Sequence, residues 1–101
     1  MMLHIIPFIP DIVLISQISK SVLNSQKSDS LLLIQDGVYA IISNFVFKDA
    51  LQKLAENYLL YALKEDIQAR GLTEKVFLDI YLIDYLEFVD LVVKHKHNIT
   101  W

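Results

Sequence analysis

The sequence predicts a three-layer, flavodoxin-like α/β domain with a mainly parallel sheet of four or five strands. Short apolar runs of strand length alternate with segments whose apolar residues recur every three or four positions. One run, Leu31–Ile34, is continuously apolar, which is typical of a parallel strand buried on both faces. Strands separated by helices are joined by right-handed crossovers, so we expect helices on both faces of the sheet.

A strand followed by a helix is expected first. Leu3–Ile6 is a short apolar run that Pro7 ends, and it is predicted to be the first strand. Asp11 can accept hydrogen bonds at the start of a helix that extends to about Ser25. The apolar positions of that helix recur with helical spacing at Ile12, Ile15, Ile18 and Val22.

Two more strands are expected in the middle of the chain, at Ser30–Gln35 and at Tyr58–Leu63. Asp36-Gly37 is a strong turn signal directly after the first of them. A short helix over Val38–Ile42 and a longer one over Lys48–Asn57 are predicted to connect the two strands.

One or two helical turns are predicted over Glu65–Arg70, because Gly71 suits the left-handed position that ends a helix. Val76–Leu78 is either a minor strand or a loop. Asp79–Ile83 is the last clear strand signal.

A final helix is predicted over Tyr85–Lys94, where Asp84 and Glu87 have the spacing of a capping pair. Asp90 and Lys94 have the spacing of a favourable ion pair on its surface. Trp101 is expected to fold back over surface that the helix leaves exposed. The stripe expected to face the core consists of Val89, Val92 and Val93.

The length of 101 residues and the mass of 11.7 kDa suit one domain spanning residues 1–101. Apolar residues make up 54% of the chain and charged residues 21%, so part of the apolar surface is expected at an interface with other chains. The net charge of −3 and the pI near 5.4 argue against direct nucleic-acid binding, which needs a basic patch.

The chain contains no cysteine, which excludes disulfides, thiolate metal sites and persulfide chemistry within it. Its charge-free stretches are too short for a membrane-spanning helix, so no membrane association is expected. The apolar N-terminal segment lacks the basic start of a signal peptide and is interrupted by Pro7, Pro10 and Asp11. We therefore expect a cytoplasmic location.

The loop over residues 7–10 contains no glycine, which argues against a phosphate or dinucleotide cradle after the first strand. His95 and His97 lack a third metal ligand nearby in sequence, so we interpret them as part of a helix end whose cations complement the helix dipole. His4 lies in a predicted strand and is interpreted as a hydrogen-bonded structural histidine.

Asp36 follows a buried strand, where an α/β enzyme can hold an acid, although a cap for the helix after Gly37 is the favoured interpretation. No Ser–His–Asp arrangement can be identified. Three acidic residues, Glu65, Asp66 and Glu74, are interpreted as solvated. The tyrosines are assigned to the core or to an interface, namely Tyr58, Tyr61, Tyr81 and Tyr85. We expect no catalytic, cofactor-binding or metal-binding residues.

Three blocks of sequence are distinctive together: LLLIQDGVYA (Leu31–Ala40), YALKEDIQARGL (Tyr61–Leu72) and DIYLIDYLEFVDLVVKHKHNITW (Asp79–Trp101). With the LHII start at Leu3–Ile6, the chain resembles the TusB/DsrH family, small subunits of bacterial sulfur-relay complexes, over nearly its whole length. The resemblance implies a DsrE-like fold and assembly with TusC-like and TusD-like subunits as a dimer of heterotrimers.

In that relay a persulfide passes through carrier proteins, including a TusE-like carrier, to the enzyme that 2-thiolates the wobble uridine of certain tRNAs. In the sulfur-oxidising branch of the family the DsrH-type chain can carry a cysteine in its first helix, and an approximate alignment places Ser21 there. A serine hydroxyl cannot hold transferable sulfur, so the resemblance implies a non-catalytic subunit. The alternatives are a DsrH-like subunit of a sulfur-oxidation complex, an enzyme using Asp36, and a small-molecule-binding flavodoxin-like module.

Overall fold

The computed structural model of the chain describes residues 2–21, 29–42, 44–76 and 80–101. All strand pairs in its five-stranded sheet are parallel, in the order β4-β3-β2-β1-β5. The strands are β1 (Met2–Ile6), β2 (Ser30–Leu33), β3 (Leu59–Leu63), β4 (Tyr81–Ile83) and β5 (His97–Thr100). The helices are α1 (Ile12–Ser21), α2 (Lys48–Ala55), α3 (Lys64–Ala69), α4 (Tyr85–Lys94) and the 3₁₀ helices η2 (Gln35–Ile41) and η3 (Thr73–Lys75).

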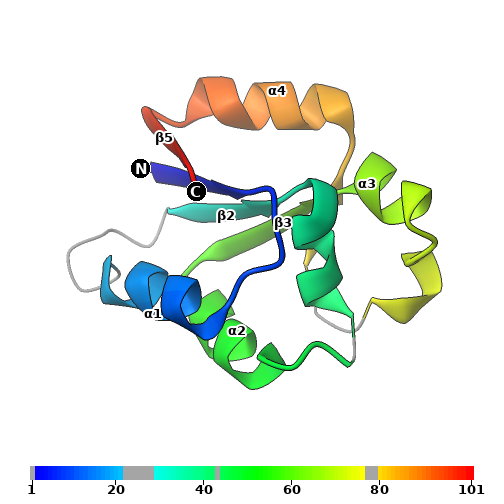
Figure 1. Cartoon of the computed structure of the whole chain (residues 1–101). Helices are drawn as coiled ribbons and strands as arrows, with labels where there is room; N and C mark the ends of the chain where they lie inside the picture. The colour runs from blue at the N-terminus through cyan, green and yellow to red at the C-terminus, as the bar shows by residue number, and fades with distance from the viewer. Residues whose placement is uncertain (1, 22–28, 43, 77–79) are drawn as a thin grey trace.

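The helices form layers on both sides of the sheet, as predicted. Figure 1 shows α1 and α2 below the sheet and α4 above it, with α3 and η2 beyond the carboxyl ends of the strands. The chain adds β2, β3 and β4 in turn on one side of β1, and then α4 crosses back so that β5 pairs with the other side of β1. The strand order therefore reverses between β1 and β5. This confirms the three-layer parallel α/β class.

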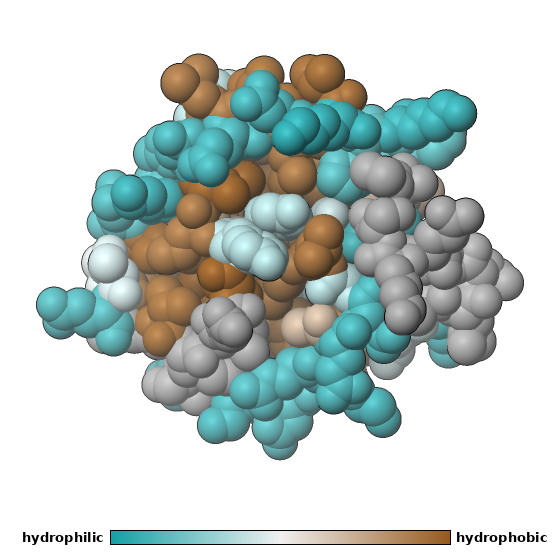
Figure 2. All heavy atoms as spheres, turned by 180° about the vertical axis from the view of Figure 1, so that it is seen from behind, coloured by the Kyte–Doolittle hydropathy of each residue, from teal (hydrophilic) through white to brown (hydrophobic). Residues whose placement is uncertain are grey.

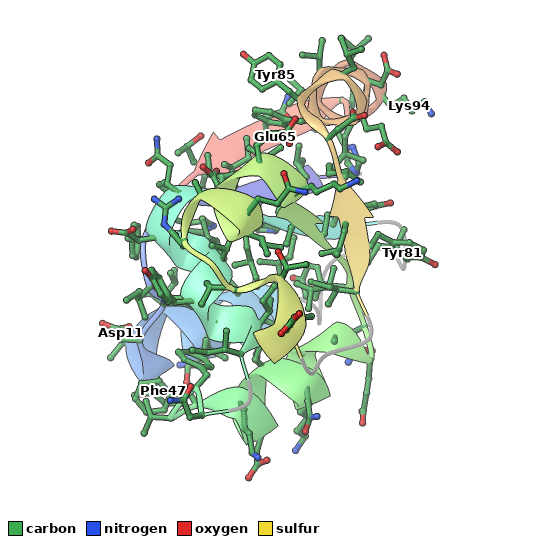
Figure 3. The ribbon with its side chains drawn as sticks, turned by 90° about the vertical axis from the view of Figure 1, so that its right-hand side faces the viewer. Asp11, Phe47, Glu65, Tyr81, Tyr85 and Lys94 are labelled. Carbon is green, nitrogen blue, oxygen red and sulfur yellow. The ribbon has the colours of Figure 1, made fainter. Side chains whose placement is uncertain are left out.

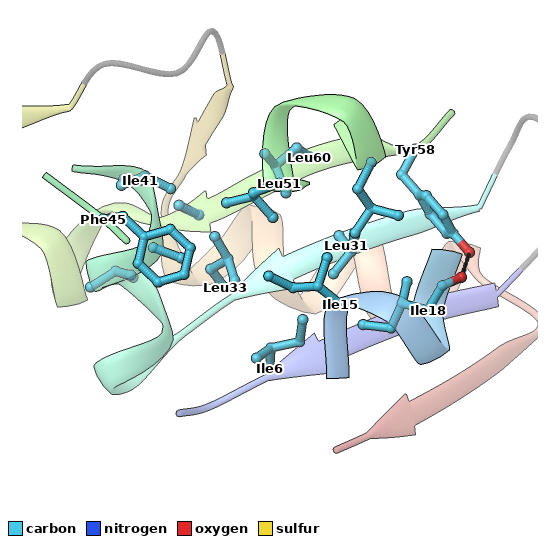
Figure 4. Packing of buried hydrophobic residues seen from close by; sticks show 14 of the residues in the cluster. Ile6, Ile15, Ile18, Leu31, Leu33, Ile41, Phe45, Leu51, Tyr58 and Leu60 are labelled. Atoms are coloured by element: carbon cyan, nitrogen blue, oxygen red, sulfur yellow. Dashed lines mark hydrogen bonds between the residues drawn. The ribbon is translucent and has the colours of Figure 1, made fainter. Parts of the chain in front are cut away.

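Side chains alternate between the two faces of the sheet, and each face carries its own core. His4 and Ile6 of β1 point towards α1 and α2, while Leu3 and Ile5 point towards α4. The larger core lies on the α1 and α2 face (Figure 4), where the hydroxyl of Tyr58 also donates to the carbonyl oxygen of Ile18 at 3.0 Å. The smaller core, under α4, is completed by half-buried side chains.

Local signals for helix ends are confirmed. The Asp11 carboxylate accepts from the backbone N–H of Leu14 at 2.8 Å, at the start of α1. Asp84 and Glu87 form a reciprocal capping box at the start of α4, with N···O distances of 2.8 and 3.1 Å. Gly71 has φ +65°, the left-handed conformation that a glycine adopts without steric cost.

The sequence did not predict β5. His97–Thr100 pairs with Met2–Ile5 at the edge of the sheet, and all four of its residues are exposed. An exposed edge strand buries neither face, so it lacks the apolar run or alternation by which strands are recognised. For Val76–Leu78 the sequence predicted either a minor strand or a loop. Val76 makes an isolated antiparallel bridge with Ile42, and residues 77–79 lie outside the described residues.

The core-facing stripe of α4 was predicted wrongly in part. Phe88, Leu91 and Val92 pack on the sheet, whereas Val89 and Val93 are exposed. With His95 these core-facing residues follow the i, i+3, i+4, i+7 spacing of one helix face, and the larger side chains occupy the wider space above the sheet. No ion pair within 4.0 Å joins Asp90 to Lys94 either. No helix in the described ranges is long and apolar enough to cross a bilayer.

Candidate functional site

The carboxyl ends of β2 and β3 carry a network of charged side chains around one strained residue. Gln35, the first residue of η2 and two positions after the end of β2, has φ +50°, in the left-handed region that non-glycine residues rarely adopt. Its backbone N–H donates to the Asp66 carboxylate across 2.6 Å, so α3 holds the strained peptide in place. Strain of this kind persists only where the surroundings compensate for it.

Arg70 joins the two segments. Its Nε and Nη2 each lie 3.1 Å from Oδ1 of Asp36, in η2, while its Nη1 donates to the carbonyl oxygen of Asp66 at 3.2 Å and lies 3.4 Å from Oδ1 of the same residue. One guanidinium, at the C-terminal end of α3, therefore connects Asp36 of η2 with Asp66 in the first turn of α3. Arg70 is about three-quarters buried, which limits the screening of these contacts by solvent.

Gly37 brings η2 against the end of β1. A Cβ atom at this position would collide with the carbonyl oxygen of Ile6 and would also approach the carbonyl oxygen of Phe8. This close approach requires glycine at position 37. It is a further reason, besides the turn, for the glycine that follows Asp36. The loop after β1 is thereby fixed beside the charged network.

Asp36 does not cap the helix after Gly37, so the favoured interpretation from the sequence is wrong. The residue before η2 is Ile34, and no side chain hydrogen-bonds as a cap there. Asp36 lies inside the first turn of η2, is 64% exposed along its side chain, and pairs with Arg70. Asp36 is therefore an exposed carboxylate whose pairing with Arg70 links η2 to α3.

Glu65 and Asp66 are also more than solvated charges. Glu65 accepts a hydrogen bond at 3.1 Å from the backbone N–H of Tyr85 and so connects α3 with the start of α4 (Figure 3). Asp66 accepts from Gln35, as described above. Glu74 is exposed, in agreement with its assignment.

The three histidines occupy different environments. His95 is buried, with Nδ1 2.8 Å from the Leu91 carbonyl oxygen and Nε2 3.0 Å from the Ser30 hydroxyl. The Nδ1–H of His95 therefore donates to the last turn of α4, and its Nε2 accepts from the Ser30 hydroxyl. These two bonds tie the end of the helix to β2. His95 thus has a structural role, but it is buried and not part of an exposed, charged helix end. His97 is exposed on β5. No group of three His, Asp or Glu side chains in the described part of the chain is placed to hold a metal ion.

His4 is only 2% exposed and contacts Trp101. The indole N–H of Trp101 donates to Nδ1 of His4 at 3.1 Å, and the two rings stack with centroids 6.0 Å apart. Burial lowers the pKa of His4, and the nearby Asp29 carboxylate opposes this only partly. Trp101 thus folds back, as expected, over surface that α4 leaves uncovered, because His4 points to the face of the sheet opposite α4.

Of the four tyrosines assigned to the core or to an interface, Tyr58 lies in the core, whereas Tyr81 and Tyr85 are exposed. Tyr58 is buried, and Tyr85 packs edge to face against Phe88. Tyr61 and Tyr81 lie side by side on β3 and β4, with ring centroids 5.4 Å apart. Burial, and after it the neighbouring Tyr81, raises the pKa of Tyr61. Ser21 is the last residue of α1.

Sequence reasoning missed Gln35 and Arg70 as site residues. Asp66 and Arg70 have the four-residue spacing of a helical ion pair, which could have indicated their contact. The left-handed conformation of Gln35 had no signal in the sequence. The residues of this network come from two of the distinctive sequence blocks. Gln35 and Asp36 belong to Leu31–Ala40, and Asp66 and Arg70 belong to Tyr61–Leu72. The two blocks meet at this edge of the sheet.

The fold and this network define the chain as a three-layer α/β protein with parallel strands in the order 4-3-2-1-5. A solved structure with the same fold is that of a protein of unknown function from Methanobacterium thermoautotrophicum. Its TM-score is 0.74 at 14% sequence identity, over 99% of this chain and 96% of that one. The family model described as DsrH like protein matches residues 15–98, so the chain belongs to the DsrH-like family.

Relatives named Protein TusB support the family assignment. The one from Photorhabdus laumondii is 45% identical over 75 residues, which is 74% of this chain and 77% of the relative. The one from Escherichia coli K12 is 44% identical over the same shares. The one from Buchnera aphidicola subsp. Baizongia pistaciae is 36% identical over 99% of this chain and 100% of the relative.

Proposed function

We propose that this chain is a non-catalytic subunit of a TusBCD-like sulfur-relay complex that supports 2-thiolation of the wobble uridine in tRNA. The observation that carries the proposal is the absence of cysteine from a member of the DsrH-like family. Sulfur relay proceeds through a thiolate that attacks and carries sulfane sulfur, and no other side chain does this at neutral pH.

The subunit acts by its shape. It binds TusC-like and TusD-like chains and helps to hold the thiol-bearing partner in position, while a TusE-like carrier and the tRNA-thiolating enzyme act later in the relay. Support comes from the rigid connections at the carboxyl edge of the sheet, where Arg70 and Asp66 hold η2 and α3 together. A location in the cytoplasm, where tRNA is modified, belongs to the same proposal.

The tRNA branch is favoured over a sulfur-oxidation complex. The relatives reported above are named Protein TusB, and an approximate alignment places Ser21 where the sulfur-oxidising branch can carry a cysteine. The alternative of a small-molecule-binding module would rest on the groove of about 490 Å³ between α1 and α2. The described residues that line this groove contribute no buried charge and no aromatic ring that would select a ligand.

The test measures sulfur on each chain separately. The complex is incubated with a cysteine desulfurase and radiolabelled cysteine, and the subunits are separated without reducing agent. Label is expected on the TusD-like chain and not on this one. Cells that lack this chain should lose thiolated uridine, and a Ser21→Ala copy should restore it in full. Stable label on this chain, or normal thiolation without it, would contradict the proposal.

A further inference from the structure

The final helix presents an apolar stripe to solvent. Leu86, Val89 and Val93 recur every three or four residues on the side of α4 that faces away from the sheet, and Leu86 and Val93 are 75% and 77% exposed. Phe88, Leu91 and Val92 already attach the helix to the sheet, so the stripe adds nothing to the core of the domain. Figure 2 shows apolar atoms along the upper margin of the molecule, above α4's polar side chains. Such a stripe is typical of a surface that a partner covers.

A row of charged side chains runs beside the stripe, on the side towards β3 and β4. It consists of Glu87, Asp90 and Lys94, spaced three and four residues apart. Within the described ranges, no ion pair under 4.0 Å includes any of the three. The carboxylate of Asp90 is therefore available to a cation from outside the chain.

A hollow of about 250 Å³ lies between this row and the sheet. It is lined by Tyr61, Ile83, Glu87, Asp90, Leu91 and Lys94. Tyr81, at the edge of the sheet (Figure 3), is 59% exposed. Its ring lies next to that of Tyr61, with centroids 5.4 Å apart. The hollow thus joins aromatic surface to two carboxylates and one ammonium group, and its net charge is negative.

These groups suit an arginine side chain. A guanidinium plane stacks on a tyrosine ring and at the same time pairs with a carboxylate through two N–H groups. The hollow is continuous with the charged row of α4, so an arginine bound there would place its own backbone beside the apolar stripe.

We propose that the apolar stripe of α4 and the adjoining hollow are the docking surface for a different protein subunit, which presents an apolar ridge flanked by an arginine. The inference rests on the proposed function, which requires a partner, and adds the surface where the partner binds. A second copy of this chain fits less well. A two-fold axis through the middle of the stripe passes near Asp90 and sets its carboxylate against that of its own copy.

The apolar part is tested with the full chain co-expressed with the TusC-like and TusD-like chains of the same organism. Val93→Glu should weaken their association by at least about tenfold, because a carboxylate is placed in an apolar contact. Val46→Glu is the matched control, since Val46 is 78% exposed in the turn before α2, and it should change the dissociation constant by less than about twofold. Circular dichroism checks that both variants are folded.

The charged part is tested by reversing one carboxylate. Asp90→Lys should weaken association by about tenfold and should reduce its dependence on ionic strength. Asp49→Lys, at an exposed position in the first turn of α2, is the control and should leave association within about twofold.

The outcomes separate the two proposals. A complex that retains Val93→Glu as well as Val46→Glu would overturn the docking surface and leave the proposed function intact. An unmodified chain that binds neither partner would contradict both. A homodimer that Val93→Glu dissociates would assign the stripe to a second copy and would likewise overturn the inference.

Discussion

The indole N–H of Trp101 donates a hydrogen bond to Nδ1 of His4, which joins residues 97 positions apart in the chain. Because indole is only a donor, His4 must accept through an unprotonated Nδ1 and carries its proton on Nε2. The Nε2 atom is buried without a hydrogen-bond partner among the described residues. The His4 ring also packs edge to face against the ring of Tyr58, with centroids 5.6 Å apart.

Trp101→Ala should therefore lower the free energy of unfolding. The variant loses the stacked ring and leaves Nδ1 of His4 without its donor, at a combined cost of about 1–3 kcal/mol. Urea denaturation followed by circular dichroism measures the loss. Tyr85→Ala is a control, because Tyr85 also contacts one ring, edge to face, but is mostly exposed. Equal stability of Trp101→Ala and the unmodified chain would show that the contact is not formed in solution.

Stability should fall as the pH is lowered below the ordinary histidine pKa of about 6.5. Burial lowers the pKa of His4 in the folded chain, so the unfolded chain takes up the proton first and the folded state loses stability as the pH falls. The contribution of His4 is fully present above that value. His4→Gln keeps an acceptor for Trp101 but does not titrate, so its unfolding free energy should depend less on pH between about 7 and 5.

Substitutions of Gln35 should separate strain from contact. Gln35→Gly relieves the left-handed conformation and keeps the N–H bond to Asp66, so stability should rise by up to about 1 kcal/mol. Gln35→Val should lower it by about 1–2 kcal/mol, because a β-branched side chain tolerates this conformation poorly. Gln52→Gly, on an exposed position of α2, is the control and should cost about 1 kcal/mol. A loss of stability in Gln35→Gly would contradict the assignment of strain.

The two glycines should differ in how well they tolerate a side chain. Gly37→Ala forces a Cβ into the carbonyl oxygen of Ile6, so the end of β1 or η2 must shift, at a cost of about 1–3 kcal/mol. A Cβ atom at position 71 would meet open space, so a side chain there is opposed only by the positive φ of the backbone. Asparagine tolerates this conformation, so Gly71→Asn should leave stability nearly unchanged. Thermal denaturation of the two variants side by side checks the order. The reverse order would mean that η2 does not approach β1 as described.

Much of the fold follows from local patterns in the sequence. The apolar runs became β1 to β4 because each of these strands buries side chains under a helix layer. Asp11, Asp84 and Gly71 were predictable because a cap or a left-handed residue acts within a few positions of itself.

What could not be predicted depends on distant residues. β5 is polar, and only its pairing with β1 makes it a strand. The contact of Arg70 with Asp36 spans 34 positions and exists because parallel strands end at the same edge. Val89 and Val93 fit a helical apolar pattern equally well on the inner or the outer side of α4, and the sheet beneath decides between them.

The pairing of Met2–Ile5 with His97–Thr100 also bears on how the chain is made. The strand β1 is synthesised before both of its neighbours, β2 and β5, and its second edge stays open until residue 100 has left the ribosome. An open strand edge is a template for pairing with other chains. Polypeptides that end within α4 would therefore keep this edge of β1 unpaired and would be prone to aggregation.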